Sequence, residues 1–224
     1  MSAFTKIVAT AALTLAASTA SAALIEVQSQ SQSTPFSLTS WNSDFTFNLF
    51  DSSLVGGATL QRVELSLFGQ SISDLTFSAT TDSWVIGSAG SSIFANLSIG
   101  GGALDIDISP SDSFGNTAPG EFVAAGTTLN LPTLTGSDAD MLATIAFADL
   151  LAFTGPGTFN VGLLGLGSLT LQAFGGNVDT VQDTQSKATF GVSYFINEPT
   201  TVPNPGTLAL LGLGLLAMRF RKSA

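Results

Sequence analysis

Apolar and polar residues alternate strictly over several stretches of this chain. They include residues 45–49, 63–67 and 104–108. Near the end, Phe190, Val192, Tyr194 and Ile196 repeat the pattern against Gly191 and Ser193. In an extended strand, a period of two places one face on a core and the other in water, as is typical of antiparallel sheets. Glycine-rich turn signals separate the stretches, for instance at residues 100–102 and 175–177. Many short strands between turns predict an all-β fold, a single antiparallel β-sandwich over residues 36–197.

The first 22 residues have the composition of a secretory signal peptide. Lys6 lies near the amino terminus, residues 7–17 are mostly apolar, and small residues follow at Ala20-Ser21-Ala22. We predict signal peptidase cleavage between Ala22 and Ala23, with Ala20 and Ala22 as the recognised small residues. The alternative is a helix of the mature fold, which would need a core partner for the apolar run.

The carboxyl-terminal segment combines prolines, a short apolar run and a basic end. The run covers residues 208–218, and as an α-helix it would measure about 16 Å against a hydrocarbon core of about 30 Å. Its leucines cover all faces of such a helix, which argues against an amphipathic core helix. We predict a Pro-rich linker over residues 198–206 and a short apolar helix within a sorting segment over residues 202–224.

Three features follow one another at this end of the chain. They are the motif Val202-Pro203-Asn204-Pro205-Gly206, the Gly/Leu-rich run, and the basic residues Arg219, Arg221 and Lys222. In this order they resemble the PEP-CTERM sorting segment of Gram-negative bacteria, which usually has Glu where this chain has Asn204. The resemblance implies transient anchoring in the inner membrane, processing by an exosortase, and a final location at the cell surface or outside the cell.

The part of the chain between the two terminal segments is strongly acidic. Between Ala23 and Met218 only Arg62 and Lys187 are cationic against 16 carboxylates, a net charge of −14. Nucleic acids and anionic lipids are therefore poor partners. The chain has no cysteine, so the core must provide the stability that disulfides give many exported proteins. Roughly 170 residues suffice for one such domain, because a domain of about 150 residues buries roughly 68–70% of its unfolded surface.

Two intervals of the body have an ambiguous pattern. Residues 23–35 contain a Gln-Ser repeat at 28–33, which predicts a polar leader or an edge strand. Residues 141–153 fit a helix that starts at an N-cap on Ser137, with Asp140 at the capping-box position. They also fit a strand from Met141 to Phe147 followed by one helical turn, which we favour because β-preferring residues occur there.

Short segments of the body resemble a family of exported domains. They are residues 50–54, 63–69, 149–157 and 188–194. In this order they are similar to the choice-of-anchor E domain, which is joined to different surface-sorting tails and has no assigned activity. The resemblance extends from about Phe36 to Ile196 and implies a β-rich body that is exported.

Residue usage excludes several kinds of catalytic site. The chain has neither His nor Cys, which rules out Ser-His-Asp and Cys-His nucleophilic sites and the usual zinc sites. It also lacks a nucleophile elbow and a phosphate-binding loop motif. A Ser-Lys dyad would need Lys187, whose neighbours in the sequence do not indicate the apolar burial that lowers a lysine pKa. We therefore expect a protein that is not an enzyme.

Acidic residues supply the remaining chemical candidates. Asp105 and Asp107 lie two apart on a predicted strand, so they share a face at about 7 Å, a pair that could serve a glycosidase. A solvated sheet face is the simpler interpretation. Oxygen ligands for Ca²⁺ also gather in this region and in a second, shorter stretch. The candidates are Asp105, Asp107, Asp112, Asn116 and Glu121, and then Asp138 and Asp140. Their spacing matches no known calcium loop, and solubility explains them more simply, so we expect no cofactor.

The functional expectation is a structural or adhesive role at the cell surface or in the extracellular matrix. Signal peptidase and exosortase are the expected processing partners, and exopolysaccharide or matrix proteins are the expected contacts. The alternative is a carbohydrate-binding module for exopolysaccharide, which needs an exposed aromatic strip beside polar donors. Trp41 and Trp84 are candidates for it, although an isolated Trp in a sandwich is more often a core residue. A two-carboxylate glycoside hydrolase is the third hypothesis.

Overall fold

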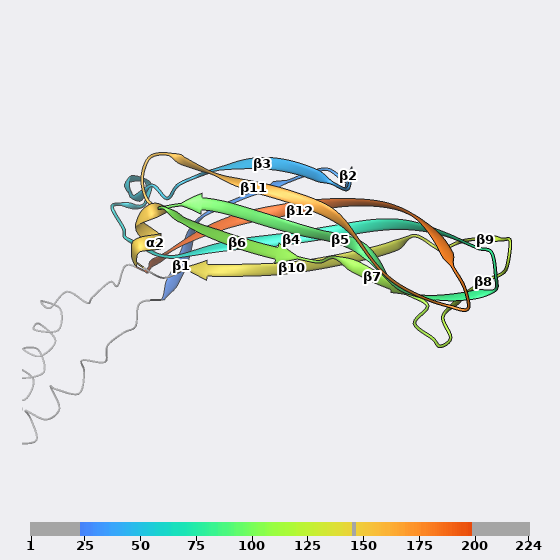
Figure 1. The fold of residues 1–224 in the computed structure, drawn as a ribbon. Coiled ribbons are helices and arrows are strands. Elements are labelled where there is room, and N and C mark those ends of the chain that lie inside the picture. Colours follow the sequence, from blue (N-terminus) through green and yellow to red (C-terminus); the bar gives the residue numbers. More distant parts are fainter. Residues whose placement is uncertain (1–22, 145–146, 199–224) are drawn as a thin grey trace, which may run out of the picture. The chain divides into compact units, whose positions relative to one another are not determined.

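Two antiparallel sheets packed together form the body of the chain, which the computed structural model describes over residues 23–144 and 147–198 (Figure 1). The predicted all-β sandwich is confirmed. The predicted signal peptide and the predicted sorting segment, with its short apolar helix, lie outside the described residues.

Sheet A has the strand order β1-β12-β4-β10. These strands are β1 (Leu24–Ser33), β4 (Leu60–Ala79), β10 (Leu134–Thr144) and β12 (Val178–Asn197). The short strands β2 (Ser37–Leu38) and β9 (Thr128–Asn130) pair with β12 and β4 respectively. The centre of the sheet is the long antiparallel pair of β4 and β12, whose register shifts once, between Phe195 and Ile196.

Sheet B has the order β3-β11-β5-β6. These strands are β3 (Trp41–Asn48), β5 (Ser83–Ile99), β6 (Gly102–Ile108) and β11 (Thr158–Phe174). Two more strands, β7 (Ser111–Phe114) and β8 (Glu121–Val123), pair with β5 further along its length. Two short helices, η1 (Ser52–Val55) and α2 (Phe147–Ala152), complete the described elements. Asp51 caps η1 by accepting a hydrogen bond from the Ser53 N–H. The Ser53 hydroxyl, and after it this N–H, lower the pKa of the Asp51 carboxyl group.

The interval that the sequence left open is a strand followed by a short helix. β10 runs from Leu134 to Thr144, and α2 begins at Phe147. Ser137 is therefore not an N-cap but a strand residue opposite Gln70 of β4. The favoured alternative holds, although the strand starts earlier and ends earlier than the sequence indicated. Pairing with residues 63–73 of β4 extends β10 over residues whose local pattern resembled a helix start.

The core divides into two apolar clusters between the sheets. The larger contains the inward residues of the predicted alternating stretches, among them Phe47, Leu65, Ile106 and Phe190. The smaller lies around Phe77, further along β4. In the predicted stretches of β3, β4, β6 and β12, one residue in two is buried, as the period of two in the sequence predicted.

Buried polar residues lie on β4 and β12 in the stretch between the core segments. Ser71, Ser73, Thr184 and Ser186 are all buried there. The hydroxyls of Ser73 and Thr184 hydrogen-bond to each other at 2.9 Å. The carbonyl of Pro110 accepts hydrogen bonds from Ser71 Oγ of sheet A at 2.7 Å and from the Ser91 N–H of sheet B at 3.0 Å. One carbonyl thus connects both sheets and satisfies the two donors that point to it, the Ser71 hydroxyl and the Ser91 N–H.

The Gln-Ser repeat forms most of β1 and joins the two sheets at one edge of the sandwich. Its serines face β12, where Ser29 and Ser33 hydrogen-bond to the hydroxyls of Ser193 and Thr189 at 3.0 and 2.7 Å. Its glutamines reach the other way, because Gln30 and Gln32 hydrogen-bond to the backbone of β3 in sheet B. The alternation therefore serves two sets of polar partners, and β1 is a structural edge strand.

Candidate functional site

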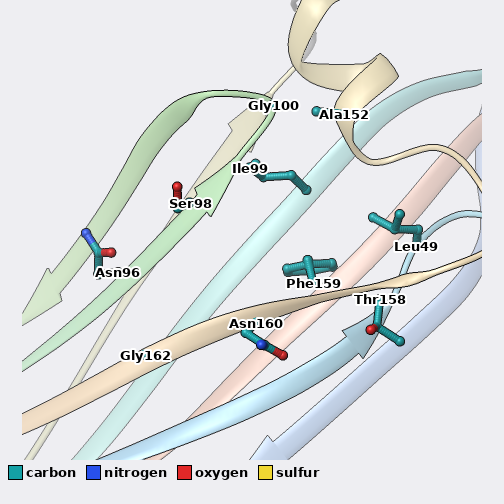
Figure 2. Close-up of a pocket in the computed structure, with 10 residues that line it drawn as sticks. All are labelled: Leu49, Asn96, Ser98, Ile99, Gly100, Ala152, Thr158, Phe159, Asn160 and Gly162. Carbon is teal, nitrogen blue, oxygen red and sulfur yellow. The ribbon is translucent and has the colours of Figure 1, made fainter.

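A pocket opens on sheet B where β5 and β11 diverge (Figure 2). The ladder between these strands ends at the pair Val161 and Leu97. Beyond that pair, Ser98 and the residues after it pair with β6, whereas β11 continues along β3 from Asn160 to Thr158. The resulting pocket has a volume of about 550 Å³. Figure 2 shows most of its lining residues on the two separating strands, with Leu49 just after β3 and Ala152 of α2 at one end.

The pocket has an apolar floor and a polar rim. Leu49, Ile99 and Phe159 line it with side chains that are buried or half-buried. The exposed rim carries four polar side chains, Asn96, Ser98, Thr158 and Asn160. Ligand sites for small molecules commonly combine an apolar lining with a few positioned polar groups.

Gly162 keeps the pocket open at its other end. It lies opposite Asn96 of β5 and Asp44 of β3. A Cβ atom at this position would come within 3.6 Å of Asp44 Oδ1 and 3.8 Å of the Asn96 carbonyl oxygen, so any larger side chain would occupy the space above the sheet. The missing side chain leaves the outer surface flat between the two rim amides.

Two hydrogen bonds orient the amides of the rim. Asn96 Nδ2 donates to Asp105 Oδ1, and Thr46 Oγ1 donates to Asn160 Oδ1 at 2.8 Å. Among the hydrogen bonds of the described residues, none uses Asn96 Oδ1 or Asn160 Nδ2. Figure 2 shows the Asn96 oxygen on the side of β11, with its nitrogen directed away. The rim therefore presents one acceptor and one donor.

The predicted carboxylate pair lies beside this pocket. Asp105 and Asp107 are both exposed on β6, with Ile106 and Ile108 buried on the opposite face. Strand alternation thus places them as the sequence indicated, on a solvated surface. Asp105 is held by the Asn96 amide, and Asp107 lies opposite Phe94 of β5.

The calcium candidates are not brought together. Asp105 pairs with residue 96 of β5 and Glu121 with residue 85, a separation of roughly 35 Å along the strand. Asp112 accepts hydrogen bonds from the backbone N–H groups of Ser113 and Thr135. Asp138 accepts one from the backbone N–H of Ser109 at 2.8 Å. In the described part of the chain, no group of three or more acidic side chains is placed to hold a metal ion.

The two tryptophans have different surroundings. Trp41 packs against the larger core cluster, and its Nε1 donates to the buried Ser186 Oγ at 2.8 Å. Trp84 faces outward on sheet B between two exposed phenylalanines, Phe174 of β11 and Phe122 of β8. The ring centroids of Trp84 and Phe122 are 4.9 Å apart.

We call Phe174, Trp84 and Phe122 the aromatic ladder. Phe174 is 53% exposed and Phe122 is 44% exposed. A second pocket of about 360 Å³ adjoins Phe174 and is lined also by Ile86, Pro119 and Gln172. No local sequence pattern indicates this grouping, because its members come from three strands and only the register between them brings the rings together. The ladder and the first pocket lie at opposite ends of β5, near β8 and α2 respectively (Figure 1).

Lys187 does not form a nucleophilic dyad. It lies half-buried on β12, with its Nζ 4.8 Å from the centroid of the Phe36 ring. Such a cation–π contact stabilises the charged ammonium group.

Over the residues described, no helix has the length and apolar character needed to cross a bilayer.

Comparison with known proteins identifies the C-terminal segment. The family described as the PEP-CTERM protein-sorting motif matches residues 201–223. This supports the resemblance of the tail, and the motif indicates an exported protein that is processed by an exosortase and held transiently through its tail. The match does not extend to the body. No curated protein sequence matches the chain.

Solved structures give weak matches to the body. A chain of the infectious bursal disease virus Gt strain is 14% identical, with 92% of this chain and 51% of the viral chain covered and a TM-score of 0.13. The secretin InvG of the Salmonella SPI-1 type III secretion injectisome is 10% identical, with 82% and 91% covered and a TM-score of 0.16. The chain thus spans about half the length of the viral chain. Similarity at this level assigns neither a fold family nor a function.

Proposed function

We propose that the chain is a surface or extracellular-matrix protein with a structural or adhesive role and is not an enzyme. The observation that carries this proposal is the PEP-CTERM motif at residues 201–223, which belongs to exported, sorted proteins. The acidic body supports it, since a net charge far from zero favours solubility outside the cell. The resemblance to choice-of-anchor domains points to the same kind of role.

Intact-mass measurement of the exported protein tests this part of the proposal. We expect a mature form that begins at Ala23 and ends before Leu208, because both terminal segments are removed. Replacement of Pro203 and Pro205 by Ala should leave the signal peptide cleavage unchanged and block the C-terminal cut. An exported protein that keeps Arg219, Arg221 and Lys222 would contradict exosortase processing.

A second proposal is that the body binds exopolysaccharide. The aromatic ladder favours it, because an exposed aromatic strip beside polar groups is what a sugar-binding surface needs. Gln172 supplies an amide next to Phe174, and the three rings offer a stacking surface to the apolar face of a sugar. A glycan array probed with the mature protein, with and without calcium, tests this proposal. Absence of binding to any polymer would leave a purely structural role.

The hydrolase hypothesis has weaker support. Asp105 and Asp107 lie on an open strand surface, whereas a glycosidase needs two carboxyl groups on either side of a bound sugar. Hydrolysis assays on polymers that bind should detect no cleavage. If cleavage is detected, replacement of both residues by Asn decides whether they cause it.

A further inference from the structure

We propose that the pocket between β5 and β11 is a binding site for a single uncharged sugar residue, recognised through its ring hydroxyls by Asn96 and Asn160. This inference rests on the proposed exopolysaccharide binding, but it concerns residues that the aromatic ladder does not share. The pocket is built for such a ligand in three respects: its shape, its hydrogen-bonding groups and its charge.

The shape suits a pyranose ring that lies flat over the floor of the pocket. The apolar floor, formed by Leu49, Ile99 and Phe159, accepts the C–H face of the ring. The polar rim then surrounds the hydroxyl groups. A volume of about 550 Å³ is within the usual range for small-ligand pockets.

The hydrogen-bonding groups complement a pair of neighbouring hydroxyls. Each hydroxyl can both donate and accept, so a matched site offers a donor and an acceptor. Asn160 Nδ2 is the donor and Asn96 Oδ1 is the acceptor, since their other amide atoms are engaged by Thr46 and Asp105. Asn160 lies two positions before Gly162, the residue that pairs with Asn96, so both amides border the same pocket. Ser98 and Thr158 add hydroxyls on the same rim.

The surrounding charge selects against anionic sugars. Asp44 and Asp105 are exposed beside the pocket, and they would repel a uronate or sulfate group. Both cations of the described residues lie on sheet A, where Arg62 pairs with Glu64 and Lys187 contacts Phe36. The outer face of sheet B therefore has no cation among its described residues to offset this repulsion.

The separation from the aromatic ladder allows the two sites to be tested independently. Trp84 and Asn96 are twelve residues apart on β5, or roughly 40 Å along an extended strand. Both face outward on the same sheet. A variant of one site therefore leaves the contacts of the other intact.

The test is a nuclear magnetic resonance titration of the ¹⁵N-labelled mature protein. The probes are cellobiose, maltose, chitobiose and galactose as uncharged sugars, and glucuronic acid as the charged comparison. At least one uncharged sugar should shift the side-chain amide signals of Asn96 and Asn160, and glucuronic acid should not. Asn160→Ala should weaken that sugar's affinity about three- to tenfold. Asn42→Ala changes an exposed amide of β3 outside the pocket and is the matched control.

Each outcome assigns the result to one proposal. If sugars shift only the Trp84 indole signal, the pocket inference is wrong while exopolysaccharide binding stands. If no probe and no array glycan binds, both are wrong. Equal weakening by Asn160→Ala and Asn42→Ala, or tighter binding of glucuronic acid, overturns the assignment of the pocket. Thr46→Val keeps the shape of the rim but releases the Asn160 amide, so it should weaken binding without unfolding the protein.

Discussion

Gln30 and Asn48 exchange two hydrogen bonds across the edge of the sandwich. Gln30 Nε2 donates to the Asn48 carbonyl and the Asn48 N–H donates to Gln30 Oε1, both at 2.9 Å. The Gln30 side-chain amide of β1 thus makes the two hydrogen bonds that a neighbouring strand would otherwise make with the Asn48 backbone of β3. Tyr194 Oη donates to the same carbonyl from within the core at 2.8 Å. This edge is consequently closed to additional strands, which is one way proteins avoid edge-to-edge association.

Gln30→Ala should reduce the free energy of unfolding by about 1–2 kcal/mol, because it removes both hydrogen bonds to Asn48. Urea denaturation measures the change. Gln185→Ala is the control, since Gln185 is exposed on β12 and should cost less than about 0.5 kcal/mol. Equal effects of the two variants would show that the pairing contributes nothing specific.

Tyr194 should make stability fall at alkaline pH. Burial raises the pKa of its phenol group well above the ordinary value, so the folded state keeps a proton that the unfolded state loses near pH 10. Ionisation then favours the unfolded chain. The stability that protonated Tyr194 contributes is therefore complete below about pH 10 and decreases as the pH rises above that value. The chain has a single tyrosine, so tyrosinate absorbance during unfolding reports this group alone. Tyr194→Phe should remove this component of the pH dependence.

Gly90→Ala should destabilise the protein by about 2–3 kcal/mol. An added Cβ would lie 2.2 Å from the Pro110 carbonyl oxygen and 2.6 Å from Ser111 Cα, and neither backbone atom can move freely. Gly102→Ala is the matched control, because its nearest neighbour is 3.8 Å away. Thermal unfolding of both variants gives the comparison. A small effect at Gly90 would mean that the connection between β6 and β7 adapts easily.

Trp84→Ala should lower the affinity for any polysaccharide that the array identifies by about tenfold. Trp84→Phe should recover part of the loss, because a ring remains between Phe122 and Phe174. Trp41→Phe serves as the control and should reduce stability but not binding, since Trp41 donates to the buried Ser186. Isothermal titration calorimetry separates the two effects. Unchanged binding by Trp84→Ala would contradict the role of the aromatic ladder.

The strands and the core were accessible from the sequence because burial follows a local rule. Val63, Leu65 and Leu67 alternate with polar residues and are all buried in the larger cluster. The helical turn before Gly155 was also predictable, whereas the extent of β10 was not. Pairing with β4 determines that extent, and pairing partners are distant in the sequence.

The candidate sites were largely hidden because they depend on register between strands. Asn96 and Asn160 are separated by 64 positions in the sequence, and they line the same pocket only because β5 and β11 pair up to Leu97 and Val161 and then separate. The sequence favoured a core position for Trp84, because an isolated tryptophan does not indicate which aromatic residues lie opposite it on the neighbouring strands. Hydrogen bonds from the Gln-Ser repeat were hidden for the same reason, since low complexity in a segment says nothing about its neighbours.

The position of β12 in sheet A affects how the body resists a mechanical force applied at its C-terminal end. β12 is the last strand before the C-terminal segment and lies between β1 and β4. Tension applied through the tail therefore runs along this strand and strains the hydrogen bonds on both its sides at once, in shear. Ladders loaded in that way break together, whereas an edge strand peeled from one end loses its bonds one after another. A pull on the C-terminal end of β12 is therefore resisted by the hydrogen bonds to β1 and β4 together.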